Sequence, residues 1–240
     1  MDNIQKLKDI ITNSDSIVLF TGAGISVPSG IPDFRSASGL YSQSFGNISP
    51  EEIISHSFFY QNPKIFYKYY KTHLIYKDAK PNKAHFYFAE LEKQGKLNAV
   101  VTQNIDNLHQ LAGSKNVYEL HGSVYRNYCT KCGKFYDLNY ILESIEVPTC
   151  QCGGIIKPDV VLYEEALDSD ILEKALFEIA NCKCLIVVGT SLTVYPAAGL
   201  IRYFKGDNLI LINKQATPYD SYANIVINDD IIKVVEQLEN

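Results

Sequence analysis

The chain has 240 residues, enough for one large domain or one domain with a smaller insert, and its 22 basic and 27 acidic side chains give a formal net charge of −5 at pH 7. No basic run is available to follow a phosphate backbone, so direct binding to nucleic acid is not expected. No stretch approaches the roughly 18 consecutive apolar residues of a membrane span, and the N-terminus is charged and amphipathic, so we expect a cytoplasmic protein with no membrane partner.

Strands and helices are predicted to alternate along most of the chain. Six short runs rich in β-branched residues are typical of strands, and the longest of them are apolar enough to be buried on both faces of a parallel sheet: 16–20, 98–103, 116–120, 184–191, 208–213 and 223–227. Helical patterns lie between these runs, at 2–13, 82–94, 168–180 and 229–239. This order predicts an α/β fold with a Rossmann-like, doubly wound parallel sheet.

Two segments interrupt this alternation. Residues 36–80 form an aromatic helical stretch, and residues 123–155 contain four grouped cysteines with little periodicity. Two surface loops would leave many aromatic side chains exposed, which folded proteins avoid in large patches. We therefore predict a small domain from 36–80 and 123–155, a helical insert plus a zinc ribbon, beside a larger domain formed by 1–35, 81–122 and 156–240.

The segment GAGISVPSGIPDFRS, residues 22–36, follows the first predicted strand. Gly22 and Gly24 allow backbone N–H groups to approach a pyrophosphate, although a plain turn is the alternative. The third glycine of a dinucleotide-binding motif is replaced by Val27, and the prolines that follow oppose a helix. The predicted result is a loop that can close over a ligand with the side chains of Asp33, Phe34 and Arg35.

Polar side chains also follow the other predicted strands. Gln103, Asn104 and Asp106 offer donors and acceptors for ribose hydroxyls and a carboxamide, although Asp106 as a helix N-cap is the alternative. Thr190, Ser191 and Asn213 follow two later strands, where ordinary turn chemistry is also an explanation. Carboxyl ends of parallel strands bind ligands in open α/β sheets, so the convergence of these groups predicts a nucleotide site.

His121 is the predicted general base, because it follows a strand end, precedes a glycine and has the side chain that titrates nearest to neutral pH. The other histidines lie in helical or loop patterns and are expected to be capping or surface residues: His56, His73, His85 and His109.

Four cysteines have spacing typical of a zinc ribbon. Cys129 and Cys132 form a C-x-x-C pair, whereas Cys150 and Cys152 are one residue closer together than the common spacing. A closed four-thiolate zinc site of structural type is predicted, and chance clustering of buried cysteines is the alternative. Cys182 and Cys184 flank a predicted strand and are expected in the core.

Several of these segments resemble the sirtuin family of NAD-dependent protein deacylases, in its bacterial form. The matching segments occur in family order from about Gly22 to Asn213: GAGISVPSGIPDFRS, TQNIDNLHQLAG, ELHGS, CTKC with CQCGG, KPDVVLYEE, GTSLTVYPAA and LIN. The resemblance implies NAD as co-substrate, structural Zn²⁺ and acetyl-lysine proteins or peptides as partners.

The resemblance also implies roles for individual residues. Catalysis would involve His121, Asn104 and Asp106. The peptide would pass between two strand-like edges, with Phe34, Val161, Tyr163 and Val194 at the substrate. The cofactor would be lined by Gly22, Ala23, Gly24, Val27, Asp33, Phe34, Arg35, Gln103, Asn104, Ile105, Asp106, His121, Gly189, Thr190, Ser191 and Asn213.

By the same resemblance, the acetyl-lysine oxygen attacks C1′ of the nicotinamide ribose, and the products are nicotinamide, O-acetyl-ADP-ribose and deacetylated lysine. The alternatives are a mono-ADP-ribosyltransferase or NAD hydrolase on the same site, or a non-catalytic NAD-sensing module.

The chain departs from the family in two places. The Tyr-x-x-Arg pair of members that remove acidic acyl groups corresponds to Tyr67 and Tyr70, and the family Phe-Gly-Glu becomes Tyr163-Glu164-Glu165. With only three arginines in the chain, uncharged acyl groups are expected.

Overall fold

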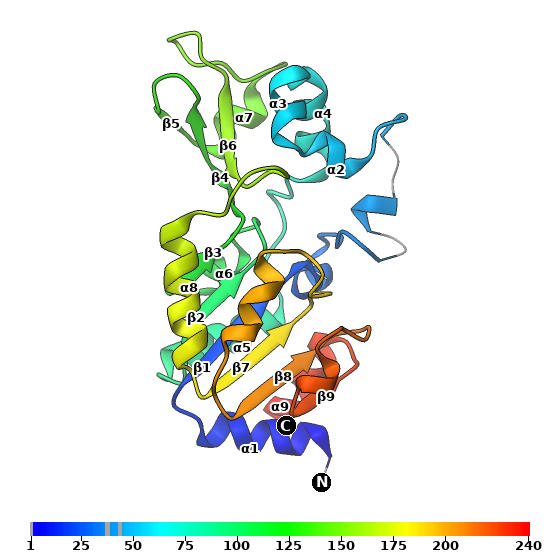
Figure 1. Cartoon of the computed structure of the whole chain (residues 1–240), viewed down its shortest axis with the longest axis vertical. Helices are drawn as coiled ribbons and strands as arrows, with labels where there is room; N and C mark the ends of the chain where they lie inside the picture. Colours follow the sequence, from blue (N-terminus) through cyan, green and yellow to red (C-terminus); the bar gives the residue numbers. More distant parts are fainter. Residues whose placement is uncertain (1, 37–38, 43–44) are drawn as a thin grey trace.

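The computed structural model describes residues 2–36, 39–42 and 45–240, and it has two lobes (Figure 1). The larger lobe contains a parallel sheet with helices on both faces, and both chain termini lie at its far end. The smaller lobe contains a second sheet and a group of helices. Within the described ranges, every helix is too short or too polar to cross a lipid bilayer.

Six parallel strands form the larger sheet in the order β3-β2-β1-β7-β8-β9. Their apolar runs are buried as predicted, with ends that differ from the sequence estimate by a few residues. The order runs outward in one direction from β1 and in the other from β7, which is the Rossmann arrangement. The strands are β1 (Ile17–Thr21), β2 (Leu97–Thr102), β3 (Val117–Glu119), β7 (Cys184–Val188), β8 (Asn208–Ile212) and β9 (Ile225–Ile227).

Helices cover both faces of this sheet because its strands are apolar on both sides. On one face, α1 (Asn3–Asn13), α5 (Lys83–Lys93) and α9 (Ile231–Glu239) pack around Leu7, Phe88 and Val234. On the other face, α8 (Ser169–Asn181) and the 3-10 helix η4 (Ala197–Tyr203) pack around Phe20 and Ile179. The doubly wound α/β fold is confirmed.

The smaller lobe is built on an antiparallel sheet of order β5-β4-β6, with β4 (Gly122–Cys129) between β5 (Phe135–Tyr136) and β6 (Ile156–Val160). Residues 156–160, which the sequence pattern groups with the larger domain, thus pair with β4 of this sheet. Burial alternates along this strand, so that Ile156, Pro158 and Val160 are buried on the face that packs on the core of the smaller lobe.

Four helices complete the smaller lobe: α2 (Pro50–Ile53), α3 (His56–Gln61), α4 (Pro63–His73) and α7 (Leu138–Glu143). The aromatic stretch supplies their common core, in which Phe59, Phe66, Tyr67 and Tyr70 are almost completely buried. Phe66 stacks on Tyr70 and meets Phe59 edge to face. The predicted helical insert therefore buries most of its aromatic side chains, in a core that it shares with β4, β6 and α7.

Candidate active site

A cavity of about 570 Å³ opens where the carboxyl ends of β1, β2, β7 and β8 face the smaller lobe. The strand order reverses between β1 and β7, and open α/β sheets bind ligands at such a point. Every residue predicted at the cofactor or substrate lines this cavity: Gly22, Ala23, Gly24, Val27, Asp33, Phe34, Arg35, Gln103, Asn104, Ile105, Asp106, His121, Val161, Tyr163, Gly189, Thr190, Ser191, Val194 and Asn213.

The glycine turn after β1 is pressed against the turn after β7. A Cβ atom on Gly24 would lie 2.6 Å from Cα of Gly189, and one on Gly22 would lie 2.8 Å from Cβ of Thr190. The N–H groups of Gly22 and Gly24 donate to the carbonyls of Val188 and Gly189. Close packing of two turns therefore requires these glycines, and the Ala23 N–H makes no hydrogen bond to another described residue.

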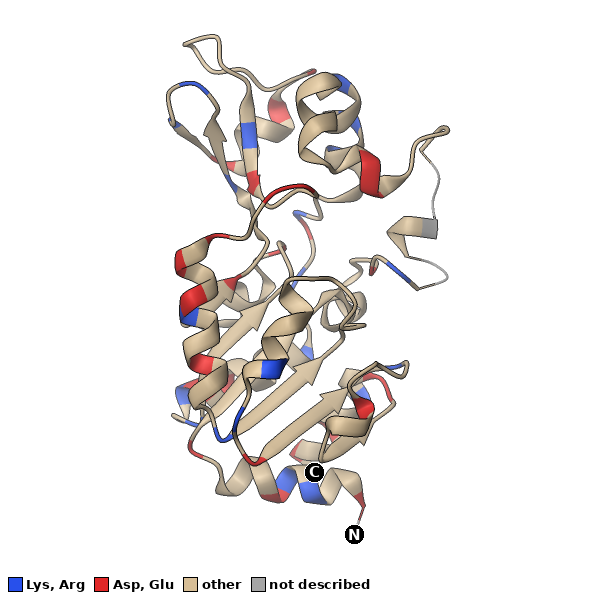
Figure 2. Ribbon diagram, viewed as in Figure 1, with Lys and Arg blue, Asp and Glu red and all other residues tan. Residues whose placement is uncertain are grey.

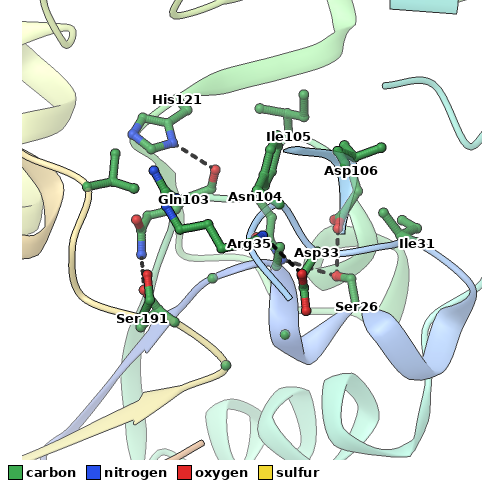
Figure 3. Close-up of a pocket in the computed structure, with 18 of the residues that line it drawn as sticks. Ser26, Ile31, Asp33, Arg35, Gln103, Asn104, Ile105, Asp106, His121 and Ser191 are labelled. Carbon is green, nitrogen blue, oxygen red and sulfur yellow. Dashed lines mark hydrogen bonds between the residues drawn. The ribbon is translucent and has the colours of Figure 1, made fainter. Parts of the chain in front are cut away.

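The segment after this turn has no α-helix but two short 3-10 turns, η1 (Ala23–Ile25) and η2 (Val27–Ser29). Pro28 lies inside η2, where its missing N–H costs little, and Gly30 ends the turn with φ of 86°. Asp33 Oδ1 accepts the backbone N–H groups of Arg35 and Ser36 at 3.1 and 2.8 Å (Figure 3). We call the described residues 22–36 and 39–42 the cofactor loop.

Ser26, Asn104 and Asp106 form a polar cluster at one end of the cavity, in which Ser26 and Asn104 are buried and Asp106 is half-buried (Figure 3). Ser26 Oγ donates to Asp106 Oδ2 at 2.6 Å and accepts from Asn104 Nδ2 at 3.1 Å. Asp106 Oδ1 also accepts, at 2.9 Å, the N–H of Leu108, the first residue of α6 (Leu108–Ala112), although the N-cap of this helix is Asn107. Burial raises the pKa of Asp106, and these hydrogen bonds oppose that rise.

His121 is held by the backbone of the neighbouring strand end. Its Nδ1 lies 3.0 Å from the carbonyl oxygen of Gln103 (Figure 3). Because a carbonyl can only accept, Nδ1 carries the proton and Nε2 is the basic nitrogen of the neutral ring. Burial lowers the pKa of His121, while the hydrogen bond to Gln103 raises it in part. The ring is therefore a neutral base of fixed tautomer at pH 7.

Two further histidines lie behind the polar cluster, completely buried. His109 Nε2 is 3.1 Å from Thr21 Oγ1, which donates to Thr102 Oγ1, and this oxygen accepts the Asn104 N–H. His85 Nδ1 accepts the Asn82 N–H and completes a capping box at α5. Burial lowers the pKa of both rings, that of His85 to about 4. His85 caps a helix as expected, but His109 is a core residue and not a capping or surface residue, because α6 packs against α5 and the His109 ring reaches Thr21 of β1.

On the other side of the cavity, residues 161–165, which we call the peptide segment, leave β6 and are joined to His121. The Val161 N–H donates to the His121 carbonyl at 3.0 Å. Glu164, which replaces the family glycine, has φ of 75°, in the left-handed region that favours glycine. Its carboxylate accepts both the N–H and the Oγ of Ser57 at 2.9 Å, which stabilises this backbone conformation.

The four clustered cysteines lie at the outer end of the smaller lobe. Their Sγ atoms are all within 4.8 Å of one another, and an ion bound by four thiolates at about 2.3 Å requires sulfur separations of about 3.8 Å. The tighter Cys150-x-Cys152 pair fits because Gly153, with φ of 81°, turns the chain, and a Cβ on Gly154 would lie 2.6 Å from Cys129 Sγ. The residues present fit a structural zinc ion.

Residues 22–196 match the model of the Sir2 family. This match covers more than half of the chain. The chain belongs to the Sir2 family. The full-length relatives include an NAD-dependent protein deacetylase of Clostridium acetobutylicum, 58% identical over 98% of both chains, and one of Staphylococcus epidermidis, 48% identical over 99% of this chain and 97% of that one.

Solved Sir2 structures have the same fold. A Sir2 variant with a deacetylated p53 peptide and 3′-O-acetyl-ADP-ribose superposes with a TM-score of 0.90 at 40% identity, over 98% of this chain and 96% of that chain. A Sir2 complex with a p53 peptide and NAD⁺ gives a TM-score of 0.86 at 41% identity, over 99% and 97%. The predicted membership of the sirtuin family is confirmed.

The cavity also contains residues that the sequence did not single out. Ser26 lies within the glycine-rich segment, which the sequence already predicted to contact a ligand, and this position was a usable signal. Tyr41 and Tyr125 also line the cavity, but they lie outside every motif. Only the packing of the two lobes brings them to the site.

Proposed function

We propose that this chain is an NAD-dependent protein-lysine deacetylase. The observation that carries the proposal is the neutral His121 ring, fixed with Nε2 as its base, in a cavity that joins a Rossmann nucleotide edge to the peptide segment. Family membership supports the same reaction. NAD supplies a glycosidic bond at which the acetyl-lysine oxygen displaces nicotinamide, so that O-acetyl-ADP-ribose and deacetylated lysine are the products.

The nucleotide is held by the turns after β1, β7 and β8. We assign the Ala23 N–H and the hydroxyl groups of Thr190 and Ser191 to the phosphates and one ribose, and Asn213 to the second ribose. Gln103 Nε2 donates to Thr190 Oγ1 at 3.0 Å, which fixes that hydroxyl. The pyridine carboxamide fits the cluster of Ser26, Asn104 and Asp106, since carboxylate and amide side chains match its donors and acceptor.

His121 accepts a proton from a ribose hydroxyl through Nε2, and the Gln103 carbonyl stabilises the imidazolium that results. The hydroxyl oxygen then attacks the acyl carbon, one water molecule supplies the oxygen that replaces the lysine nitrogen on that carbon, and the imidazolium returns its proton to the departing amine. The protein needs no nucleophile of its own for this sequence of steps. Val161 is attached to the backbone of the residue that carries this base, since its N–H donates to the His121 carbonyl.

We propose peptides with uncharged acyl-lysine as the substrates. An extended peptide would pair by its main chain with residues near Tyr163 and Val194. A charged acyl group would need an arginine, but Arg126 is bonded to Glu119 and Asp159 at 2.6 and 2.7 Å, and Arg202 is bonded to Tyr219 and Tyr195. The third arginine, Arg35, lines the cavity from the cofactor loop, and we assign it to NAD. Tyr67 and Tyr70 are buried in the small core.

A cytoplasmic location is also proposed. Its support is the set of four clustered thiols, since a reducing compartment keeps cysteines available as metal ligands instead of disulfides. The division of the chain into a domain of 1–35, 81–122 and 156–240 and one of 36–80 and 123–155 stays a proposal as well, and at its last boundary residues 156–160 pair with the smaller sheet.

The test uses purified protein, NAD and an acetyl-lysine peptide, with products followed by mass spectrometry. The wild-type chain is expected to release nicotinamide, O-acetyl-ADP-ribose and the deacetylated peptide in equal amounts. His121→Ala is expected to reduce deacetylation by at least about 100-fold, because general-base catalysis contributes that much or more. ADP-ribosylated peptide or free ADP-ribose as the main product would instead indicate transfer or hydrolysis, and NAD binding without turnover would indicate a sensing module.

A further inference from the structure

The cofactor loop and the peptide segment meet at the mouth of the cavity through two tyrosines. The hydroxyl oxygens of Tyr41 and Tyr163 lie 2.7 Å apart, so that one donates a hydrogen bond to the other. Both residues line the cavity. Tyr41 is 122 positions before Tyr163 in the chain, and the bond therefore joins two segments that are far apart in sequence.

Tyr41 contacts two other residues of the cofactor loop, Phe34 and Arg35. Its N–H donates to the Phe34 carbonyl at 2.9 Å, and its ring meets the Phe34 ring edge to face at 5.4 Å. The Arg35 guanidinium lies 5.2 Å from the centre of the same ring. Burial and the neighbouring Tyr163 hydroxyl raise the pKa of Tyr41, which therefore stays a neutral phenol. A displacement of Tyr41 would move Phe34 and Arg35 with it.

Tyr163 is anchored to the smaller lobe. Its N–H donates to the Ile54 carbonyl at 3.0 Å, and its own carbonyl accepts the His56 N–H at 2.9 Å. The next residue, Glu164, is bonded to Ser57 by both carboxylate oxygens. Figure 2 shows this acidic stretch crossing from the smaller lobe toward α8. Tyr163 is thus fixed to the smaller lobe through both its N–H and its carbonyl group.

We propose that the Tyr41–Tyr163 hydrogen bond couples peptide binding to cofactor binding, so that a peptide seated beside Tyr163 holds the cofactor loop closed over NAD. This inference rests on the proposed deacetylase function. Tyr163 is a positioning residue in this role, because it acts on the nucleotide through Tyr41, Phe34 and Arg35. The family resemblance has phenylalanine at this position, and phenylalanine has no hydroxyl to form such a bond.

The experiment measures binding of a carbocyclic NAD analogue, which cannot react, by calorimetry with and without a saturating acetyl-lysine peptide. The ratio of the two dissociation constants is the coupling factor. Tyr41→Phe and Tyr163→Phe remove one hydroxyl each and keep the rings. We expect each to reduce the coupling factor by about 2- to 10-fold, the effect of one neutral hydrogen bond, and the double variant to reduce it no further.

The matched control is Tyr222→Phe, which removes the hydroxyl of an exposed tyrosine outside the cavity and should keep the wild-type coupling factor. Binding of the peptide must change by the same factor when the analogue is added, because coupling is reciprocal. Wild-type coupling in both single variants, reductions that multiply in the double variant, or no coupling in the wild-type chain would each overturn the proposal. Turnover of the wild-type chain tests the deacetylase function separately.

Discussion

Asp106 provides the carboxylate of the polar cluster, and its two oxygens accept from Ser26 and from the Leu108 N–H. Asp106→Asn replaces one of these oxygens with an NH₂ group, which cannot accept. We expect KM for NAD to rise by about 10- to 100-fold, since hydrogen bonds to a charged group contribute about 1.5–3 kcal/mol. Steady-state kinetics with saturating acetyl peptide measures this, with Ser26→Ala as the milder control. A KM within about twofold of wild type would remove Asp106 from the nicotinamide pocket.

His85 links the stability of the fold to pH. Its pKa is lowered by burial to about 4 in the folded chain, against 6.5 for the ordinary side chain. The unfolded chain therefore binds a proton that the folded chain excludes, and stability falls as pH drops below about 6.5, by up to roughly 3 kcal/mol near pH 4. His109 is buried beside it and acts in the same direction.

His85→Gln tests this link, because glutamine at the same helical position preserves the capping box. Between pH 7 and pH 5 the variant should lose less unfolding free energy than the wild-type chain in urea titrations. An equal loss in both proteins would assign the acid sensitivity to other groups.

At the scale of elements, the contact between the turns after β1 and β7 forms one wall of the cavity in which we propose that NAD binds. Gly24→Ala places a methyl group 2.6 Å from Gly189 Cα, so one turn must move. We expect a loss of about 1–3 kcal/mol in unfolding free energy and at least about a tenfold weaker binding of NAD.

Gly95→Ala is the matched control for this change. Gly95 has a left-handed φ of 74° and no atom within 4 Å of the added Cβ, and it lies outside the cavity. This variant should lose stability from backbone strain alone and bind NAD as the wild-type chain does. Calorimetry on both variants separates the two effects, and equal NAD affinities would contradict the role of the turn contact.

For the whole molecule, we expect the zinc site to determine whether the smaller lobe stays folded. Cys129 ends β4, and β6 leads from the cysteine cluster to the peptide segment. Cys129→Ser should lower zinc below one ion per chain in elemental analysis and lower Tm. The parallel sheet should keep its far-ultraviolet circular dichroism, because its cores contain none of the four ligands.

Deacetylation should fall together with zinc content. Cys182→Ala removes a core thiol that lies outside the cluster and should retain the metal. Purified wild-type protein without zinc, or a Cys129→Ser variant with unchanged Tm, would refute the site.

The sequence alone determined the alternation of strands and helices, because runs such as Cys184–Val188 and Asn208–Ile212 are apolar on both faces and can only be buried between two helical layers. It also indicated the strand-end polar residues and the cysteine ligands, since these are local patterns of residue type and spacing. The family resemblance added roles that pattern alone left open.

Only the tertiary structure decided how distant segments use these residues. It showed that Gly22 and Gly24 serve a contact with Gly189 and Thr190, that His109 is buried behind Asn104, and that Tyr41 reaches Tyr163. Each of these facts depends on atoms brought together from separate parts of the chain by packing. A residue's own neighbours in sequence fix its backbone preference, whereas its partners across the fold fix its protonation, its tautomer and the space around it.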